Sequence, residues 1–499
     1  MKGKSVNIWI LLLCGLWILS AGCQRKEPPN LVYVFADQLR YDVLGYMGDT
    51  RAITPHIDKL ASEGVYFSNS VSVSPVCAPY RASLFTGKYS SSTGMVVNEI
   101  RMNPNHRAIA HVLQEGGYET GYIGKWHLWG AEAGGHHKDK NSFTPPGPGR
   151  LGFDGVWKSY GFHHNNYNSY YYEDKPEKIY YGEGVFEPEA QFDMAIDFLR
   201  ENAGKETPFA LFLSVGIPHD PWDKDNVPES FYKMFKDVDF PLPETMSDYP
   251  DQYMDRNRDS VKWLNYWKPR MPEFKRVYYA MNTALDTYMG RLTAALEEQG
   301  LADNTILVFT SDHGEMFGEN SRVYKMTFYD KAARIPFIIR WPKKIKPGRS
   351  LDACFNTPDI MPTLLGMMGL EVPGEAEGMD MSELVISGEG DEPEYAFMQG
   401  MGHTYLWLDG YEWRAVRDKQ YTYARYLTDG KELLFDNLND PLQATNLVDN
   451  QEYSEKLIEL RSQMTEKMAE LNDQFMPCSW YRDHWTENRI IKASARGTF

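Results

Sequence analysis

Four short clusters of acidic, basic and histidine side chains stand out in the sequence because each directly follows an apolar run. Carboxylates bind hard cations, lysines hold anions, and histidines transfer protons near neutral pH. One such cluster alone would most simply be an exposed turn, whereas four of them after four apolar runs indicate a single site. The clusters are Asp37-Gln38, Lys125-Trp126-His127, His219-Asp220 and Asp312-His313-Gly314-Glu315.

The apolar runs are predicted strands of one sheet, at residues 31–35, 121–124, 209–215, 305–309 and 335–339. Helical patterns lie between them at 55–63, 108–115, 188–202 and 273–299, the last with apolar residues every three to four positions. This alternation predicts an α/β fold with a mostly parallel or mixed central sheet flanked by helices on both faces. Ligands of such sheets bind beyond the carboxyl ends of the strands, where the polar clusters stand.

The composition changes near residue 375, where Gly- and Glu-rich stretches interrupt the pattern. Strand-like pieces follow at 395–398, 413–416 and 421–426, and then a helical pattern at 453–471. We therefore predict a large catalytic domain at 31–374 and a smaller α+β subdomain with an antiparallel sheet at 375–499.

The amino terminus has the pattern of an export signal, with Lys2 and Lys4 before an apolar run and small residues before Cys23. The arrangement resembles a bacterial lipobox. It predicts a lipoprotein-type signal peptide at 1–22, a lipid on Cys23 that holds the protein to a membrane, and a tether at 23–30. The alternative is an ordinary secretory signal. Either way we expect an exported protein, in the bacterial periplasm or at the outer membrane.

Net charge and cysteine content narrow the function further. The formal net charge of −17 argues against nucleic-acid binding, which needs a basic surface. Beyond Cys23 the chain has three cysteines, of which Cys354 and Cys478 could pair or be buried singly. The remaining one, Cys77, lies in a Pro-rich stretch. Nothing in the sequence indicates an oligomeric state.

The residues around Cys77 carry a family resemblance. Cys77-Ala-Pro79-Tyr-Arg81-Ala-Ser-Leu84, followed by Thr86-Gly-Lys88, resembles the signature of the formylglycine-dependent sulfatases of the alkaline phosphatase superfamily. In that family a maturation enzyme oxidises the cysteine to formylglycine (3-oxoalanine). The chain departs from the commoner pattern at Tyr80, usually serine, and at Gln38, usually aspartate. The resemblance extends over nearly all of the chain that follows the signal.

The resemblance implies a cation site. Its residues would be Asp37, Gln38, Cys77, Asp312 and His313. Oxygen ligands suit a hard cation, so we expect one Ca²⁺ in preference to Mg²⁺ or Zn²⁺. The neutral amide of Gln38 removes one negative charge from the ligand set and should weaken cation binding.

The resemblance also implies a role for each remaining residue. One hydroxyl of the hydrated formylglycine at position 77 would lose its proton toward Asp312 and attack sulfur. Lys125 and Lys325 would hold the sulfate oxygens, and His219 would bind the substrate and protonate the departing alcohol. His127 would help to deprotonate the second hydroxyl, which releases sulfate, and Arg81 would orient the diol.

Sulfated glycans, as poly- or oligosaccharides, are the expected substrates. The stretch at 163–172 mixes aromatic, histidine and amide side chains, which suit a sugar ring, although it could equally be a Tyr-rich loop packed on the sheet edge. Two alternatives remain open: a phosphonate or phosphate ester hydrolase of the same superfamily, and a non-catalytic glycan-binding lipoprotein.

Overall fold

The computed structural model describes residues 27–130, 139–254, 259–403 and 406–499. The predicted signal peptide, the predicted lipidation site Cys23 and the first residues of the tether lie outside these ranges. Among the helices of the described ranges, none has both the length and the apolar character needed to cross a bilayer.

A central sheet of eight strands runs through the large domain in the order β10-β2-β9-β8-β1-β7-β3-β4. β1 is parallel to β7 and β8, and β3 is parallel to β7 and β4. The predicted α/β fold is therefore confirmed. The strands are β1 (Asn30–Asp37), β2 (Val65–Phe67), β3 (Glu119–Lys125), β4 (Val156–Tyr160), β7 (Phe209–Pro218), β8 (Thr305–Ser311), β9 (Phe337–Arg340) and β10 (Arg349–Leu351).

β9 departs from the parallel arrangement, since it runs antiparallel to both β8 and β2. Chain direction explains the difference. The segment 312–336 holds His313, Glu315 and Lys325 at the carboxyl end of β8, so the chain re-enters the sheet from that same end. The sheet is consequently mixed, and the strand expected at 335–339 begins two residues later than predicted.

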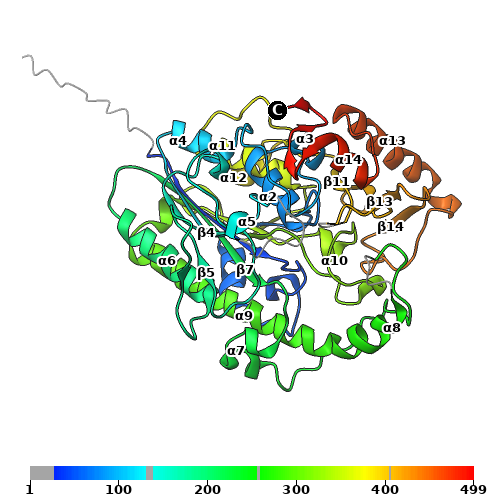
Figure 1. Cartoon of the computed structure of the whole chain (residues 1–499), viewed down its shortest axis with the longest axis horizontal. Helices are drawn as coiled ribbons and strands as arrows, with labels where there is room; N and C mark the ends of the chain where they lie inside the picture. Colours follow the sequence, from blue (N-terminus) through cyan, green and yellow to red (C-terminus); the bar gives the residue numbers. More distant parts are fainter. Residues whose placement is uncertain (1–26, 131–138, 255–258, 404–405) are drawn as a thin grey trace, which may run out of the picture.

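The two faces of the sheet bury separate cores because strand side chains alternate. In β1, Leu31, Tyr33 and Phe35 pack under one helical layer, whereas Val32 and Val34 pack under the other. Figure 1 shows the two layers on opposite sides of the sheet. The first layer contains α2 (Cys77–Thr86), α4 (Ile109–Glu115) and α11 (Thr357–Met368), and the second contains α1 (Pro55–Glu63), α6 (Glu187–Asn202) and α9 (Lys268–Glu298).

The carboxyl-terminal part forms a second, antiparallel sheet, as predicted. Its strands are β11 (Ala396–Gly400), β12 (Trp413–Arg417), β13 (Tyr421–Tyr426) and β14 (Glu432–Asp436). Helix α13 (Ser454–Glu470) packs on one face through Leu457 and Leu460, and the other face packs against Phe328 and Tyr329 of the large domain. The boundary between residues 374 and 375 stays a prediction.

The remaining features of the fold are two buried cysteines and a set of short helices and strands. Cys354 and Cys478 are both buried and free, so they are buried singly. The other named elements are short: α3 (Ser90–Thr93), α5 (Asp139–Ser142), α7 (Glu229–Met234), α8 (Ser260–Lys262), α10 (Asp330–Ala333), α12 (Ser382–Ser387), α14 (Cys478–Trp485), β5 (Tyr170–Tyr171), β6 (Ile179–Tyr180), β15 (Thr486–Glu487), β16 (Ile490–Ile491), β17 (Ala493–Ser494) and β18 (Gly497–Thr498).

Candidate active site

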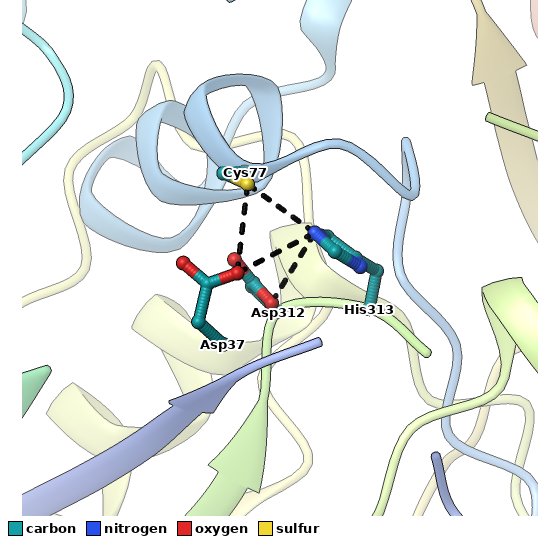
Figure 2. A group of neighbouring side chains, drawn as sticks. All are labelled: Asp37, Cys77, Asp312 and His313. Atoms are coloured by element: carbon teal, nitrogen blue, oxygen red, sulfur yellow. Dashed lines mark hydrogen bonds and ion pairs between the residues drawn. The ribbon is translucent and has the colours of Figure 1, made fainter. Parts of the chain in front are cut away.

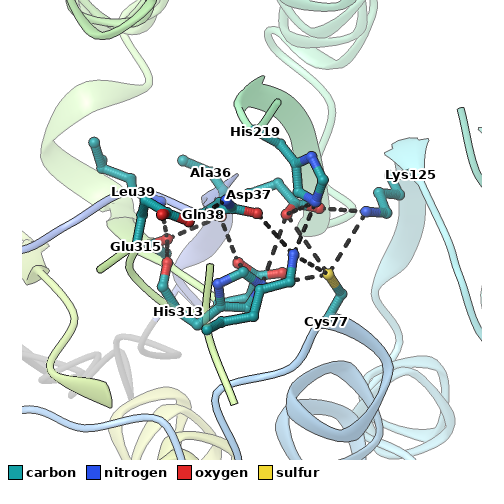
Figure 3. Close-up of polar contacts among 12 residues, drawn as sticks. Ala36, Asp37, Gln38, Leu39, Cys77, Lys125, His219, His313 and Glu315 are labelled. Atoms are coloured by element: carbon teal, nitrogen blue, oxygen red, sulfur yellow. Dashed lines mark hydrogen bonds and ion pairs between the residues drawn. The ribbon is translucent and has the colours of Figure 1, made fainter. Parts of the chain in front are cut away.

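The predicted polar clusters meet at one edge of the sheet. β8, β1, β7 and β3 are consecutive neighbours, so their carboxyl ends lie side by side. Asp37 ends β1, Lys125 ends β3, His219 directly follows β7 and Asp312 directly follows β8. Figure 3 shows these ends converging on one group of side chains.

Cys77 is the first residue of α2, and the residue before it, Val76, has extended backbone. Pro79 occupies the first turn, where its missing N–H costs no helical hydrogen bond. Every side chain of α2 is buried, so the helix has no face exposed to solvent. The helix therefore presents Cys77 from its amino-terminal end to the edge of the sheet (Figure 2).

The Cys77 sulfur lies among side chains of both charges. Its distance to His313 Nε2 is 3.3 Å. Asp37 Oδ1, Lys125 Nζ and Lys325 Nζ each lie 3.7 Å from the sulfur. Burial, reinforced by the Asp37 charge, raises the pKa of the Cys77 thiol to about 11, so the unmodified thiol is protonated at neutral pH.

Two buried carboxylates, Asp37 and Asp312, face this sulfur. They differ in how far nearby positive charges offset their negative charge. Lys125 Nζ lies 2.6 Å from Asp37 Oδ2, and Arg81 lies 3.3 Å from the same oxygen. Although burial raises it, the pKa of Asp37 is held well below its usual range by Lys125, His219 and Arg81. Burial and the Asp37 charge raise the pKa of Asp312 to about 7. Asp312 thus carries the less compensated charge.

The carboxylate pair fits a hard divalent cation. Ligand atoms of Asp37, Cys77, Asp312 and His313 all lie within 4.8 Å of one another (Figure 2). Asp312 Oδ2 is buried, and no described residue makes a hydrogen bond with it. A buried carboxylate oxygen is costly without a partner. A cation beside both carboxylates would supply that partner, with the oxygen donors that Ca²⁺ prefers.

The side-chain amide of Gln38, at the edge of this group, is hydrogen-bonded at both its nitrogen and its oxygen. Its Nε2 donates to Glu315 Oε2 at 2.7 Å, and its Oε1 accepts from Lys325 Nζ at 2.7 Å (Figure 3). Its backbone is left-handed (φ 69°), and its N–H donates to Asp312 Oδ1 at 3.0 Å. The amide oxygen already accepts a hydrogen bond from Lys325, and Gln38 as a metal ligand stays a prediction.

Lys125 and Arg81 are positioned where β3 and β7 approach each other closely. Gly124 has a φ of 103°, and a Cβ there would lie 2.0 Å from the Ser214 carbonyl oxygen, so only glycine fits. Arg81 donates to the carbonyl of Lys125 and, at 2.7 Å, to Ser214 Oγ. Arg81 therefore ties α2 to β3 and β7 and reaches the carboxylates. It has no hydrogen bond to Cys77, so its predicted effect on the diol stays a prediction.

His219 and Lys325 form a buried pair. Lys325 Nζ lies 2.8 Å from His219 Nε2, and His219 Nδ1 lies 2.8 Å from the carbonyl oxygen of Asp220. Since lysine donates and a carbonyl accepts, this network places the imidazole hydrogen on Nδ1 and leaves Nε2 as the acceptor. Burial, the neighbouring His164 and Lys325 lower the pKa of His219 well below its usual value. The ring is therefore neutral before an anion binds.

His127 is paired with a residue that the sequence analysis did not identify. Its Nε2 lies 3.0 Å from Glu99 Oε1, and its buried Nδ1 has no hydrogen-bond partner among the described residues. Burial raises the pKa of Glu99 to about 7, although Lys125 and Arg489 oppose the shift. The one signal for Glu99 was an acidic residue in the largely apolar stretch 95–100. His127 has no hydrogen bond to Cys77.

The structure thus brings together most of the predicted site residues. Asp37, Cys77, Lys125, His313 and Lys325 are in direct contact. Four others contact this group at its edges: Gln38, Arg81, His219 and Asp312. His127 instead makes its hydrogen bond to Glu99. Within the stretch 163–172, Tyr172 pairs with Ser159 of the edge strand β4, and His164 stacks on His219. Tyr172 therefore fits the interpretation of a loop packed on the sheet edge, and the sugar-binding interpretation of the stretch stays a prediction.

Comparisons with known proteins agree with this architecture. The sulfatase family model matches residues 29–370, and a model of the carboxyl-terminal part of N-sulphoglucosamine sulphohydrolase matches residues 318–474. An ulvan-active sulfatase of Formosa agariphila is 37% identical over 92% of this chain and 85% of its own. An endo-4-O-sulfatase of Bacteroides thetaiotaomicron is 28% identical over 94% of this chain and 96% of its own.

A solved structure shows the same fold along almost its whole length. A candidate sulfatase of Bacteroides fragilis superimposes with a TM-score of 0.76 at 30% identity, and the match covers 92% of this chain and 98% of that one. Sequence and fold therefore agree over both the large domain and the carboxyl-terminal part.

Proposed function

The chain belongs to the sulfatase family and is a sulfuric ester hydrolase, and we propose that it hydrolyses sulfate esters of glycans through a formylglycine formed from Cys77. One observation carries the proposal. The Cys77 sulfur lies 3.7 Å from both Lys125 Nζ and Lys325 Nζ and equally close to Asp37. The side chain at this position is surrounded by groups that can hold an anion and a cation together.

The cation site supports a divalent ion, for which Ca²⁺ is our choice because of the oxygen donors. Asp37, Asp312 and His313 would hold it, together with residue 77 and Gln38. When bound, the ion supplies positive charge against the sulfate oxygens and lowers the pKa of a hydroxyl at residue 77. The remaining chemistry belongs to the protein's own residues.

The first step forms a sulfur–oxygen bond and breaks another. A hydroxyl of the formylglycine hydrate gives its proton to Asp312 and attacks sulfur, and the bond between sulfur and the sugar oxygen breaks. Lys125 and Lys325 hold the sulfate oxygens as charge accumulates on them. The arriving sulfate favours the protonated form of His219, which then gives its proton to the sugar oxygen as it leaves.

The second step regenerates the aldehyde. The second hydroxyl of residue 77 loses its proton to His127, the bond between carbon and the sulfate oxygen breaks, and inorganic sulfate departs. The free Nδ1 of His127 is the acceptor, since Glu99 occupies Nε2. Addition of water to the aldehyde restores the hydrate, so the net reaction consumes one water for each ester.

The glycan substrate is inferred from the relatives and from the site. One relative is named an ulvan-active sulfatase, and another is named an endo-4-O-sulfatase. Aromatic, histidine and amide side chains at 163–172 begin next to His219, on the side where the alcohol would leave. The predicted lipid on Cys23 would hold the enzyme to a membrane outside the cytoplasm. A maturation enzyme would convert Cys77 to formylglycine.

A competition experiment tests the proposal against both alternatives. Purified wild type and Cys77→Ala would be given sulfated oligosaccharides and a phosphonate monoester, and the release of each product measured. We expect turnover of at least one sulfated oligosaccharide by wild type, and none by Cys77→Ala with an unchanged unfolding temperature. Faster turnover of the phosphonate would favour the ester-hydrolase alternative, and binding without turnover would favour a glycan-binding protein.

A further inference from the structure

His164 lies flat against His219, although it belongs to a different element. The two ring centroids are 3.9 Å apart, and the ring planes differ by 9°. His164 belongs to the loop between β4 and β5, at the start of the stretch with mixed aromatic and amide side chains. Such parallel stacking fixes the position of one ring relative to the other.

The loop is anchored on both sides of this contact. Asn226 Nδ2 donates to the His164 carbonyl at 3.2 Å, and the Asn166 N–H donates to Asn226 Oδ1 at 2.8 Å. The Phe162 ring meets the His164 ring edge-on at 4.2 Å. Hydrogen bonds from Asn226 and Asn166 therefore fix the backbone at His164, and Phe162 packs against the His164 ring. The fold thus sets the position of the ring.

The nitrogens of the His164 ring remain available. Among the described residues no group makes a hydrogen bond with either nitrogen, and the side chain is partly exposed, whereas His219 is 7% exposed. His164 therefore lies on the solvent side of His219, and Lys325 and His219 lie on the side that faces the sulfate. A group on the departing alcohol would meet His164 directly after passing His219.

We propose that His164 binds a hydroxyl of the departing sugar and, through the stack, holds the His219 ring in place; the inference rests on the proposed function. One face of its ring is covered by His219, so His164 contributes hydrogen bonds to the sugar rather than stacking. A hydroxyl both donates and accepts, and a neutral imidazole offers one nitrogen of each kind.

Local charge favours the neutral form of His164. The ring is next to His219, which must carry a proton during catalysis, and two parallel imidazolium rings at 3.9 Å would repel each other. Burial and the charge of Lys125 also lower the pKa of His164 well below its usual value. His164 therefore selects a neutral hydroxyl next to the sulfate and gives no charge attraction to a second sulfate or a carboxylate there.

Paired substrates and paired variants test this inference. His164→Phe keeps a flat ring against His219 but has no nitrogens, and His164→Ala removes both. The substrates are 4-nitrophenyl sulfate, which has no sugar hydroxyl, and a sulfated oligosaccharide that wild type turns over. For His164→Phe we expect kcat/KM on the oligosaccharide to fall about fivefold to tenfold, the effect of one hydrogen bond, mainly through KM. The same variant should stay within about twofold of wild type on the aryl sulfate.

His164→Ala should additionally lower kcat on the oligosaccharide, because His219 loses its support. Glu177→Gln, at an exposed position between β5 and β6 and outside the stretch 163–172, is the control and should match wild type on both substrates. Equal losses on both substrates for His164→Phe, unchanged oligosaccharide kinetics, or the same loss in the Glu177→Gln variant would each overturn the assignment. Wild type that hydrolyses the aryl sulfate but no sulfated glycan would instead overturn the proposed function.

Discussion

Replacing His219 by alanine should separate substrates according to how much their leaving groups need a proton. His219 Nε2 contacts Lys325, and Nδ1 is held by the carbonyl of Asp220, so the ring is fixed with one nitrogen toward the sulfate-binding lysine. A sugar alkoxide is a poor leaving group and must be protonated as it departs. A nitrophenolate is stable without a proton.

The expected magnitudes follow from this difference. A positioned general acid contributes about 10²–10⁴-fold to the rate, equivalent to about 3–5 kcal/mol of transition-state stabilisation. We therefore expect kcat/KM of His219→Ala on a sulfated sugar to fall by that factor. On 4-nitrophenyl sulfate the remaining loss is one hydrogen bond to Lys325, about 1 kcal/mol or about fivefold.

The assay is steady-state kinetics on both substrates with wild type and His219→Ala, with unfolding temperatures measured for each protein. His484→Ala, which removes an exposed histidine of α14, is a control that should leave both rates unchanged. Equal losses on the two substrates would remove His219 from the role of general acid. A loss confined to the aryl sulfate would contradict the placement of the leaving group beside His219.

Three further predictions use the same structure. Asp473→Ala leaves the fully buried Arg414 guanidinium without its carboxylate and should lower the free energy of unfolding by about 3–5 kcal/mol, measured by denaturant titration; an unchanged midpoint would contradict it. Glu99→Gln should make the loss of wild-type activity as the pH falls through about 7 shallower, because the Glu99 carboxylate, present above that pH, keeps the hydrogen of His127 on Nε2, while Asp312 still titrates there; a pH profile identical to wild type would refute this role. Dialysis against a chelator should lower both activity and unfolding temperature, and Ca²⁺ should restore them; retention of both by metal-free protein, confirmed by elemental analysis, would argue against the cation site.

The parts of the fold that the sequence predicted are those with a strong local pattern. β1, β7 and β8 are continuous apolar runs because both faces of the sheet are covered. α9 repeats apolar residues every three to four positions. β2 and β10 have only three residues each, too few to show any period. α2 was not predicted as a helix because every side of it is buried and Pro79 lies near its start.

The site divides in the same way. Asp37, Lys125, His219 and Asp312 follow predicted strands, so sheet topology alone brings them together. Glu99 belongs to no strand or motif, and only the tertiary structure places it beside His127. The stack of His164 on His219 joins the loop after β4 to the end of β7, and no spacing in the sequence encodes such a contact.

The chemical state of residue 77 is the central claim, and it is directly measurable. Intact peptide mass spectrometry should be applied to the segment around Cys77, using protein purified from its native host. The proposed mechanism predicts an aldehyde in place of the thiol, in a form that reacts with a hydrazide probe. An unmodified thiol in protein that still releases sulfate would contradict it.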